Sequence, residues 1–266
     1  MSKINAEIKK YVKENFLDEL LQVEIDFDIK RGINESVDPK VVTPYKADWD
    51  NLVRLHKLVR RRRVTTILEF GCGYSTLVFA DALARNRDSY GKFVTSKLRR
   101  NNPFELHVVE DMPFYLDAVK KRIPTRLESI VSFTKAEVRM TTFCDRTCTE
   151  YSELPNICPD FIYLDGPSQH SATGDICGIS TRHPDRLPMS CDLLKIEHYL
   201  LPGTLIVVDG RTANARFLRS NLQRNWSYRH DKSADVNLFE LVESPLGRYN
   251  QAQIRFCLGA KWPKNS

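Results

Sequence analysis

Three features are missing from the sequence, and each absence removes a class of protein. No apolar run approaches the ~20 residues that a transmembrane helix needs, so no membrane-spanning segment is expected. The seven cysteines form no paired C-x-x-C motifs, which disfavours structural zinc, and their odd number does not suit a secreted disulfide framework. Residues 1–10 carry charges where a signal peptide needs an apolar segment. We therefore expect a cytoplasmic protein with free thiols.

The composition is that of a globular protein. The chain has 266 residues, of which 42% are hydrophobic and 28% charged, which suits one large domain with additions. The net charge of +6 favours anionic partners. Residues 60–63 are four consecutive arginines, which we interpret either as a solvated helix end or as a phosphate- or nucleic-acid-binding patch.

Short apolar segments alternate with helical patterns from residue 64 onward. This alternation predicts a parallel sheet that is covered by helices on both faces. The predicted strands are 64–70, 105–110, 129–134, 160–165 and 203–209, and the predicted helices between them are 75–85, 112–122, 190–200 and 212–222.

The two ends of the chain depart from this alternation. Residues 236–242 and 253–258 are predicted strands with no helix between them, so we expect an antiparallel hairpin at one sheet edge. Near the N-terminus, apolar residues at helical spacing predict helices over 3–22 and 48–62. The polar stretch 85–103 is interpreted as a surface insertion.

A glycine turn follows the first predicted strand. Gly71 and Gly73 would let a ligand approach the backbone, and a helix that begins at Ser75 would favour the ligand's carboxylate. Thr76 stands where a dinucleotide fingerprint has its third glycine, which disfavours a nicotinamide-dependent oxidoreductase. Glu69, at the end of the strand, would repel a pyrophosphate and attract an ammonium group.

Three further strands also end in carboxylates. Glu110, Asp165 and Asp209 each close a predicted strand, and ligands of open parallel sheets bind at the carboxyl ends of strands. A carboxylate in the place of Glu110 can accept bonds from both hydroxyls of a ribose, or it can cap the helix that follows.

With the segment Glu69–Ser75 closing the first strand, the chain resembles the class I S-adenosylmethionine-dependent methyltransferases over residues 64–258. The resemblance implies an α/β fold: a Rossmann-like, doubly wound, mostly parallel seven-stranded sheet with an antiparallel C-terminal hairpin and extra N-terminal helices. Residues 1–63 would be a helical cap over the substrate, and residues 64–266 the methyltransferase domain. The implied reaction is O-methylation of a small or sugar-like hydroxyl substrate.

The same resemblance implies the cofactor contacts. Glu110 and Asp111 would lie at the ribose, and Ala136 and Glu137 at the adenine. The full set predicted to bind adenosylmethionine is Glu69, Gly71, Gly73, Tyr74, Ser75, Thr76, Glu110, Asp111, Ala136, Glu137 and Asp165.

Catalysis is assigned to His170, Asp165 and Asp209. His170 is the expected general base, since a histidine titrates near working pH and the segment matches the Asp-Gly-x-His pattern of some O-methyltransferases at a longer spacing. Alternatively, Asp165 and Asp209 would hold Mg²⁺. Gly210 stands where catechol-type enzymes have a third ligand, so the base is favoured.

The acceptor is expected to be a small molecule. The long segment 171–190 would form part of its pocket, with a positive rim from Arg182, His183, Arg186 and Arg211. Two alternatives remain: a nucleotide or nucleic-acid methyltransferase, disfavoured because no Asn/Asp-Pro-Pro-Tyr/Phe-like motif occurs, and a non-catalytic adenosylmethionine-binding subunit.

Overall fold

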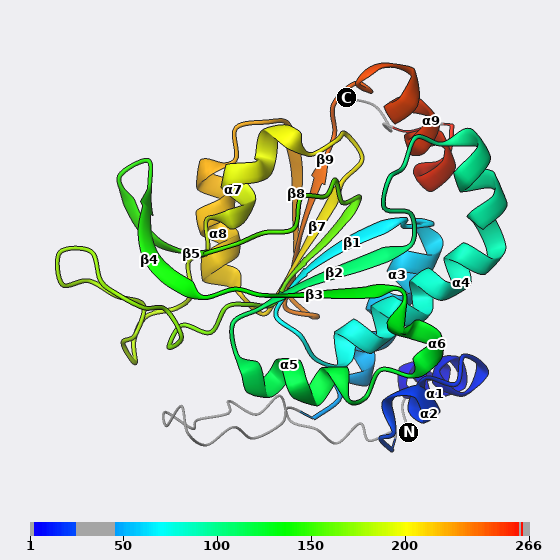
Figure 1. Cartoon of the computed structure of the whole chain (residues 1–266), viewed down its shortest axis with the longest axis horizontal. Coiled ribbons are helices and arrows are strands. Elements are labelled where there is room, and N and C mark those ends of the chain that lie inside the picture. The colour runs from blue at the N-terminus through cyan, green and yellow to red at the C-terminus, as the bar shows by residue number, and fades with distance from the viewer. Residues whose placement is uncertain (1–2, 25–45, 261, 263–266) are drawn as a thin grey trace.

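The protein is built around one seven-stranded sheet. The computed structural model describes residues 3–24, 46–260 and 262. The strand order is β3-β2-β1-β6-β7-β9-β8, and in this sheet β9 alone runs in the opposite direction to the other strands (Figure 1). The strands are β1 Thr66–Phe70, β2 Glu105–Glu110, β3 Val131–Lys135, β6 Phe161–Leu164, β7 Leu205–Asp209, β8 Trp226–Asp231 and β9 Val236–Leu241. This sheet confirms the predicted fold class.

Helices cover both faces of the sheet. One face carries the N-terminal helices together with α3, α4, α5 and α6, and the other carries α7, η1 and α8, while α9 lies at the edge where the strands begin (Figure 1). The helices are α1 Lys3–Glu14, α2 Leu17–Leu21, α3 Trp49–Arg61, α4 Tyr74–Lys97, α5 Pro113–Lys120, α6 Thr125–Glu128, α7 Asp192–Ile196, the 3₁₀ helix η1 Glu197–Tyr199, α8 Thr212–Asn221 and α9 Gly247–Leu258. Within the described residues, no helix combines the length and apolar character that crossing a membrane requires.

The side-chain alternation of the strands divides the core in two. Along β1, Ile67 joins the cluster beneath α3 and α4, whereas Leu68 and Phe70 join the cluster beneath α7 and α8. All five residues of β1 are buried, as expected for a central parallel strand. Residues of α1 and α2 belong to the same cluster as Ile67, so the division at residue 63 stays a prediction.

The C-terminal hairpin is present, but one of its strands was wrongly placed. β9 agrees with the prediction, whereas its partner is β8, and residues 253–258 lie in helix α9. Alternating apolar residues in 253–258 imitate a strand, yet the buried residues Asn250, Gln253 and Ile254 have the i, i+3, i+4 spacing of a helix. β8 was missed because it lies at the sheet edge and is only half buried.

One further expectation needs correction, and one pair of strands was missed. Residues 85–97 are not an insertion, because α4 continues to Lys97 and buries Asn86 and Val94 on its way. A second, two-stranded sheet also follows β3: β4 Val138–Phe143 pairs with β5 Arg146–Tyr151. Its turn places Cys144 and Asp145 at positive φ without a glycine, so the usual hairpin signal is missing from the sequence.

Candidate functional site

The site is at the carboxyl edge of the sheet, where the turns after β1 and β6 touch. Gly71 has φ +86°, and a Cβ there would lie 3.1 Å from the carbonyl carbon and oxygen of Asp165. A Cβ on Gly166 would lie 2.7 Å from the backbone nitrogen of Gly71. The two turns therefore pack backbone against backbone. Gly71 is a glycine because of this contact as well as its positive φ.

Gly73 differs from Gly71 in both respects. Its φ of −179° is an extended conformation that any residue adopts, and a Cβ there would meet nothing within 4 Å. Open space thus lies against this backbone, at the N-terminus of α4. Of the two glycines, Gly73 is the one at which a ligand can approach the chain.

Glu69 has a carboxyl group that is only half satisfied. The side chain is fully buried, and Oε1 accepts a 2.6 Å hydrogen bond from Ser75 Oγ. Oε2 is buried without a partner. Burial raises the pKa of Glu69 to about 8, against the opposing effect of the bonds from Ser75 and Thr76. A cationic group that reached Oε2 would satisfy it and favour the charged carboxylate.

The hydroxyl groups after the turn are oriented by the turn itself. Thr76 is fully buried, and its Oγ1 accepts a 3.1 Å hydrogen bond from the Gly73 backbone nitrogen. The ring of Tyr74 is covered by the Arg122 guanidinium at 5.2 Å. These contacts fix the first turn of α4, whose free N–H groups suit an anionic group of a ligand.

Glu110 accepts hydrogen bonds from backbone amides of three separate segments of the chain. Oε2 accepts from the backbone nitrogen of Cys72 at 2.9 Å, and Oε1 accepts from that of Met112 at 2.8 Å, just before α5. Its backbone oxygen accepts from Ala136. Burial raises the pKa of Glu110 to about 7, although the bonds from both amides oppose the shift. A carboxylate offers about four acceptor positions, so two remain for a ribose.

The adenine positions fall at the start of the β4–β5 hairpin. Ala136 is buried, whereas Glu137 is exposed and its backbone nitrogen donates to Ser152 Oγ at 3.0 Å. Asp111 is partly buried, directly after Glu110. The roles of these residues at a ligand stay predictions.

Asp165 is paired with an arginine from the next strand end. Arg211 Nε donates to Asp165 Oδ1 at 3.4 Å, and the same guanidinium donates to the carbonyls of Asp165 and Pro167. Although 52% of the Asp165 side chain is accessible, desolvation raises its pKa to about 6, with Arg211 lowering it and Asp209 raising it. Arg211 therefore fixes the turn after β6.

Asp209 belongs to a different cluster, which the sequence did not indicate. Tyr163 donates to Asp209 Oδ2 at 2.7 Å, Asn51 Nδ2 donates to the same oxygen, and the Arg54 guanidinium lies 3.8 Å from Oδ1. Asn51 and Arg54 come from α3, which the sequence analysis assigned to the cap. The sequence does hold one indication of this cluster: Asn51 is a polar residue on the side of α3 that is otherwise apolar and buried.

These pairings leave little room for Mg²⁺ between the two aspartates. Asp165 binds Arg211, and Asp209 binds Tyr163 and Asn51. Across residues 3–24, 46–260 and 262, no group of three or more His, Cys, Asp or Glu side chains could hold a metal ion. The donor set does not fit the metal alternative.

The loop after β6 carries His170 at the surface. His170 is exposed, and its backbone nitrogen donates to Ser168 Oγ at 3.3 Å. The expected positive rim is engaged within this loop: Arg182 donates to the Gly174 carbonyl and Arg186 to that of Ser180. His183 accepts from the Asp185 backbone nitrogen. The catalytic role of His170 stays a prediction.

Tyr151, at the end of β5, adds a polar group that the sequence analysis missed together with its hairpin. Its ring lies 5.6 Å from that of Phe70, and its hydroxyl is buried without a hydrogen-bond partner. A Cβ on Gly166 would be 2.6 Å from this hydroxyl. Burial raises the pKa of Tyr151, and the charges of Asp111 and Glu110 add to the effect. The hydroxyl thus lies at the touching turns, beside the acidic end of β2.

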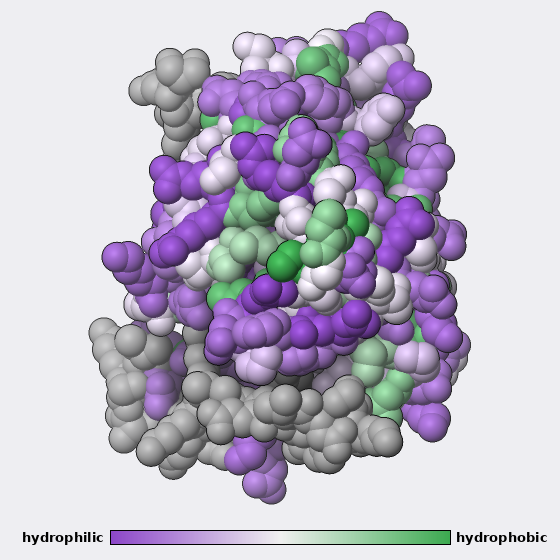
Figure 2. All heavy atoms as spheres, turned by 90° about the vertical axis from the view of Figure 1, so that its left-hand side faces the viewer, coloured by the Kyte–Doolittle hydropathy of each residue, from purple (hydrophilic) through white to green (hydrophobic). Residues whose placement is uncertain are grey.

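The hairpin and loop form one side of the molecule. Figure 2 shows that side, with apolar atoms gathered in its middle among polar ones. The loop between β6 and α7 exposes the apolar side chains of Ile179 and Leu187. An apolar surface beside the carboxyl edge suits a small-molecule acceptor.

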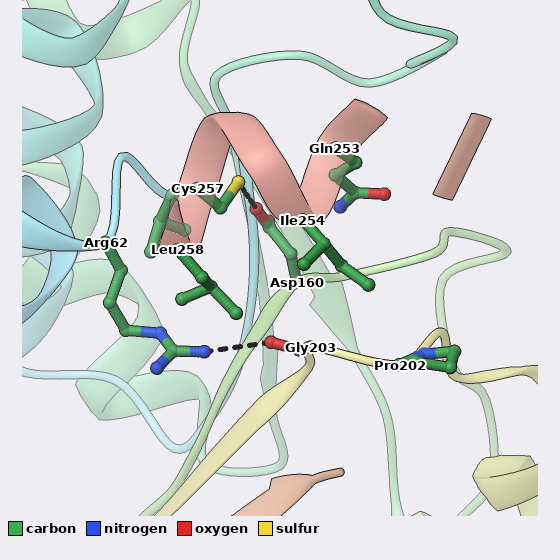
Figure 3. Close-up of a pocket in the computed structure, with 9 residues that line it drawn as sticks. Arg62, Asp160, Pro202, Gly203, Gln253, Ile254, Cys257 and Leu258 are labelled. Atoms are coloured by element: carbon green, nitrogen blue, oxygen red, sulfur yellow. Dashed lines mark hydrogen bonds between the residues drawn. The ribbon is translucent and has the colours of Figure 1, made fainter. Parts of the chain in front are cut away.

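A small, partly open hollow lies at the opposite edge of the sheet, and it is not the site. Its volume of about 10 Å³ is at the lower limit for one water molecule. Figure 3 shows it between α9 and the starts of β6 and β7, with Cys257 directed at Asp160 and Arg62 at the Gly203 carbonyl.

Comparisons with known proteins give a weak likeness. No family model and no curated protein matches the chain. Among solved structures, the O-methyltransferase TomG of Streptomyces achromogenes, involved in tomaymycin synthesis and solved with SAM, is 14% identical, with 92% of this chain and 91% of that chain covered and a TM-score of 0.41. The SAH-bound methyltransferase PaMTH1 of Podospora anserina is 11% identical, with 91% and 94% covered and a TM-score of 0.46. An O-methyltransferase of Bacillus cereus with SAH is 13% identical, with 90% and 91% covered and a TM-score of 0.39. Likenesses of this strength assign neither an activity nor a substrate.

Proposed function

We propose that the protein is an S-adenosylmethionine-dependent methyltransferase that methylates a hydroxyl group of a small or sugar-like molecule. The observation that carries the proposal is the unpartnered, buried Oε2 of Glu69, beside the open backbone of Gly73. An amino-acid group fits this place, because its ammonium would pair with Glu69 and its carboxylate with the N-terminus of α4.

The neighbouring strand end supports the nucleoside half of the same cofactor. Glu110 keeps acceptor positions free while two backbone amides hold its carboxylate in place. A pyrophosphate, in contrast, would meet Glu69, Glu110 and Asp165 at the ends of three adjacent strands. A pyrophosphate offers these carboxyl groups no cation to pair with, and any of them that is ionised repels it, which disfavours a dinucleotide.

Methyl transfer requires little chemistry from the protein beyond position and proton removal. Bound adenosylmethionine would supply an electrophilic methyl group on a sulfonium. The turns after β1 and β6 would hold the acceptor hydroxyl in line with it, and positioning of this kind lowers a barrier by ~7–11 kcal/mol. His170, in the loop after β6, would accept the hydroxyl proton that methylation of the acceptor releases.

Titration calorimetry tests the proposal. Adenosylhomocysteine should bind, NAD should not, and Glu69→Gln should weaken the binding of adenosylhomocysteine by about tenfold or more, as expected for loss of a charge-assisted bond. Glu128→Gln makes the same substitution at an exposed position of α6 and should have no effect. Binding of NAD in place of adenosylhomocysteine would overturn the proposal. Tight binding without methyl transfer to any hydroxyl substrate would favour a non-catalytic subunit.

A further inference from the structure

The second half of α4 and helix α9 together form a strongly cationic surface. Residues 85–100 contain six Lys or Arg and one acidic residue, Asp88, and no Asp or Glu follows Glu243. The cations of these two segments are Arg85, Arg87, Lys92, Lys97, Arg99 and Arg100, and, on α9, Arg248 and Arg255. The two helices lie side by side (Figure 1), joined by contacts of Val94 with Phe256 and its neighbours.

Exposed aromatic rings are interleaved with these cations. Tyr249 is 48% exposed, and the guanidinium groups of Arg99 and Arg248 lie 5.2 and 4.8 Å from the centre of its ring. Phe93 is 47% exposed and stacks on Phe256, with 5.4 Å between centroids and 18° between ring planes. Arginines on exposed rings present flat, cationic surfaces on which further planar groups can stack.

A third arginine, Arg63, lies beside the buried Phe256 of α9. Arg63 is exposed, and its guanidinium lies 5.2 Å from the ring of Tyr90 and 5.7 Å from that of Phe256. Tyr249 and Phe256 are seven positions apart on α9, which places them about two turns, or about 10 Å, apart along the same side of the helix. We call Arg63, Phe93, Arg99, Arg248 and Tyr249 the arginine–aromatic face.

The acidic groups around this face are engaged elsewhere. Glu240 pairs with Arg62 at 2.7 Å, and Glu243 pairs with Arg224. Arg100 is not part of the face, because it is buried against Thr66 and the Cys158 carbonyl. The positive charge of the exposed arginines is therefore not cancelled by these carboxylates, and the surface suits a polyanion that also carries flat groups.

We propose that the arginine–aromatic face binds single-stranded nucleic acid. The arginines would contact phosphates, and bases would stack on Tyr249 and Phe93, the combination by which proteins bind single strands without reading their sequence. Helix α9, which carries Arg248 and Tyr249, lies over the edge where β6 and β7 begin (Figure 3), opposite the carboxyl edge, so the face is a docking surface and not the methylation site. The inference does not depend on the proposed function.

Fluorescence anisotropy of the full chain with labelled oligouridylate and oligothymidylate of about 12 nucleotides, within the usual site sizes, tests this proposal. The double variant Arg99→Gln/Arg248→Gln should weaken binding by about tenfold and lower the slope of log K against log salt by about 1.4, the value for two phosphate contacts. Tyr249→Leu should weaken binding by about five- to tenfold through lost stacking. Comparison of the two oligonucleotides distinguishes RNA from DNA.

Arg219→Gln is the matched control, since Arg219 also lies on a tyrosine ring, that of Tyr228 at 4.6 Å, but on α8. It should bind oligonucleotides like the parent protein. Equal losses in Arg219→Gln and the double variant, or no binding at low salt, would overturn the proposal. So would equally tight binding of heparin, a polyanion without bases, together with no effect of Tyr249→Leu. Circular dichroism checks folding, and Phe93→Ser provides a second test of stacking.

Discussion

The hydroxyl of Tyr163, near the end of β6, donates a 2.7 Å hydrogen bond to Asp209 at the end of β7. Asn51 donates to the same carboxylate oxygen, so one aspartate joins two strand ends to the first turn of α3. The side chain of Tyr163 is fully buried. The cluster explains why a helix before the sheet in sequence is fixed at the edge where the site lies.

We expect Tyr163→Phe to lower the free energy of unfolding by ~1.5–3 kcal/mol, because it removes a buried hydrogen bond to a carboxylate. Tyr228→Phe is the control: its hydroxyl donates to the neutral amide oxygen of Asn237 at 2.8 Å, so a loss of only ~0.5–1.5 kcal/mol is expected. Urea denaturation measures both. Equal losses would show that the Asp209 cluster contributes no more than an ordinary hydrogen bond.

Gly71 and Gly73 should respond differently to alanine. Gly71→Ala places a Cβ 3.1 Å from the Asp165 backbone at positive φ, so a loss of stability of ~1–3 kcal/mol is expected. Gly73→Ala meets open space in an extended backbone, so stability should be kept while affinity for adenosylhomocysteine falls. Thermal melting with and without ligand separates the two effects. Normal affinity in Gly73→Ala would show that the ligand does not approach this backbone.

Binding of adenosylhomocysteine should strengthen as pH rises from 6 to 8. Burial raises the pKa of Glu69 to about 8, so the ligand-free carboxyl group is protonated at neutral pH and must lose its proton to pair with an ammonium. One obligatory proton release changes affinity by about tenfold per pH unit below that pKa. Calorimetry in buffers of different ionisation enthalpy detects the proton. Glu69→Gln should bind weakly with a shallower pH dependence, and an unchanged slope in this variant would place the proton on another group.

The raised pKa of Glu69 also affects the stability of the ligand-free protein. Because the folded pKa of Glu69 lies above the ordinary value of 4.5, its contribution to stability is present below about 4.5 and is lost as pH rises through about 8. We therefore expect the free energy of unfolding of Glu69→Gln, relative to that of the parent protein, to be higher at pH 9 than at pH 6. Urea denaturation at both pH values measures this, and an unchanged difference would contradict a buried, protonated Glu69.

Tyr151→Phe should have the opposite effect on stability from Tyr163→Phe. The Tyr151 hydroxyl is buried without a partner, so its removal should leave stability unchanged or raise it by up to ~1–2 kcal/mol. If the hydroxyl bonds a ligand at the carboxyl edge, affinity for adenosylhomocysteine should fall by about fivefold or more, the usual effect of one lost hydrogen bond. Unchanged affinity with raised stability would show that Tyr151 does not contact this ligand.

His170→Ala tests the base. A histidine base makes turnover rise with pH near neutrality, and the variant should lose that rise and about 10²–10⁴-fold in rate. His183→Ala is the control, an exposed histidine of the same loop whose ring accepts a bond from Asp185. Full activity of His170→Ala would place the base elsewhere, and restoration of activity by Mg²⁺ after chelation would revive the metal alternative.

The sequence by itself determined the elements whose patterns are local. Five parallel strands, the glycine turn after Phe70 and the carboxylates at four strand ends could all be read from it, because burial on both faces makes the central strands β1, β6 and β7 mostly apolar. The α4 helix was read only in its first part, since charged residues on its outer side hid a helix that continues to Lys97.

Tertiary structure decided which residues meet. Asn51 contacts Tyr163 and Asp209, residues more than a hundred positions away, and no local period encodes such a pair. The edge strand β8 (WSYRHD) and the hairpin strand β5 (RTCTEY) consist mostly of polar residues, so neither appears as an apolar segment in the sequence, and Tyr151 could not be placed either. The need for glycine at position 71 was visible in the sequence. Its physical reason, contact with the Asp165 backbone, appears only when β1 and β6 lie side by side.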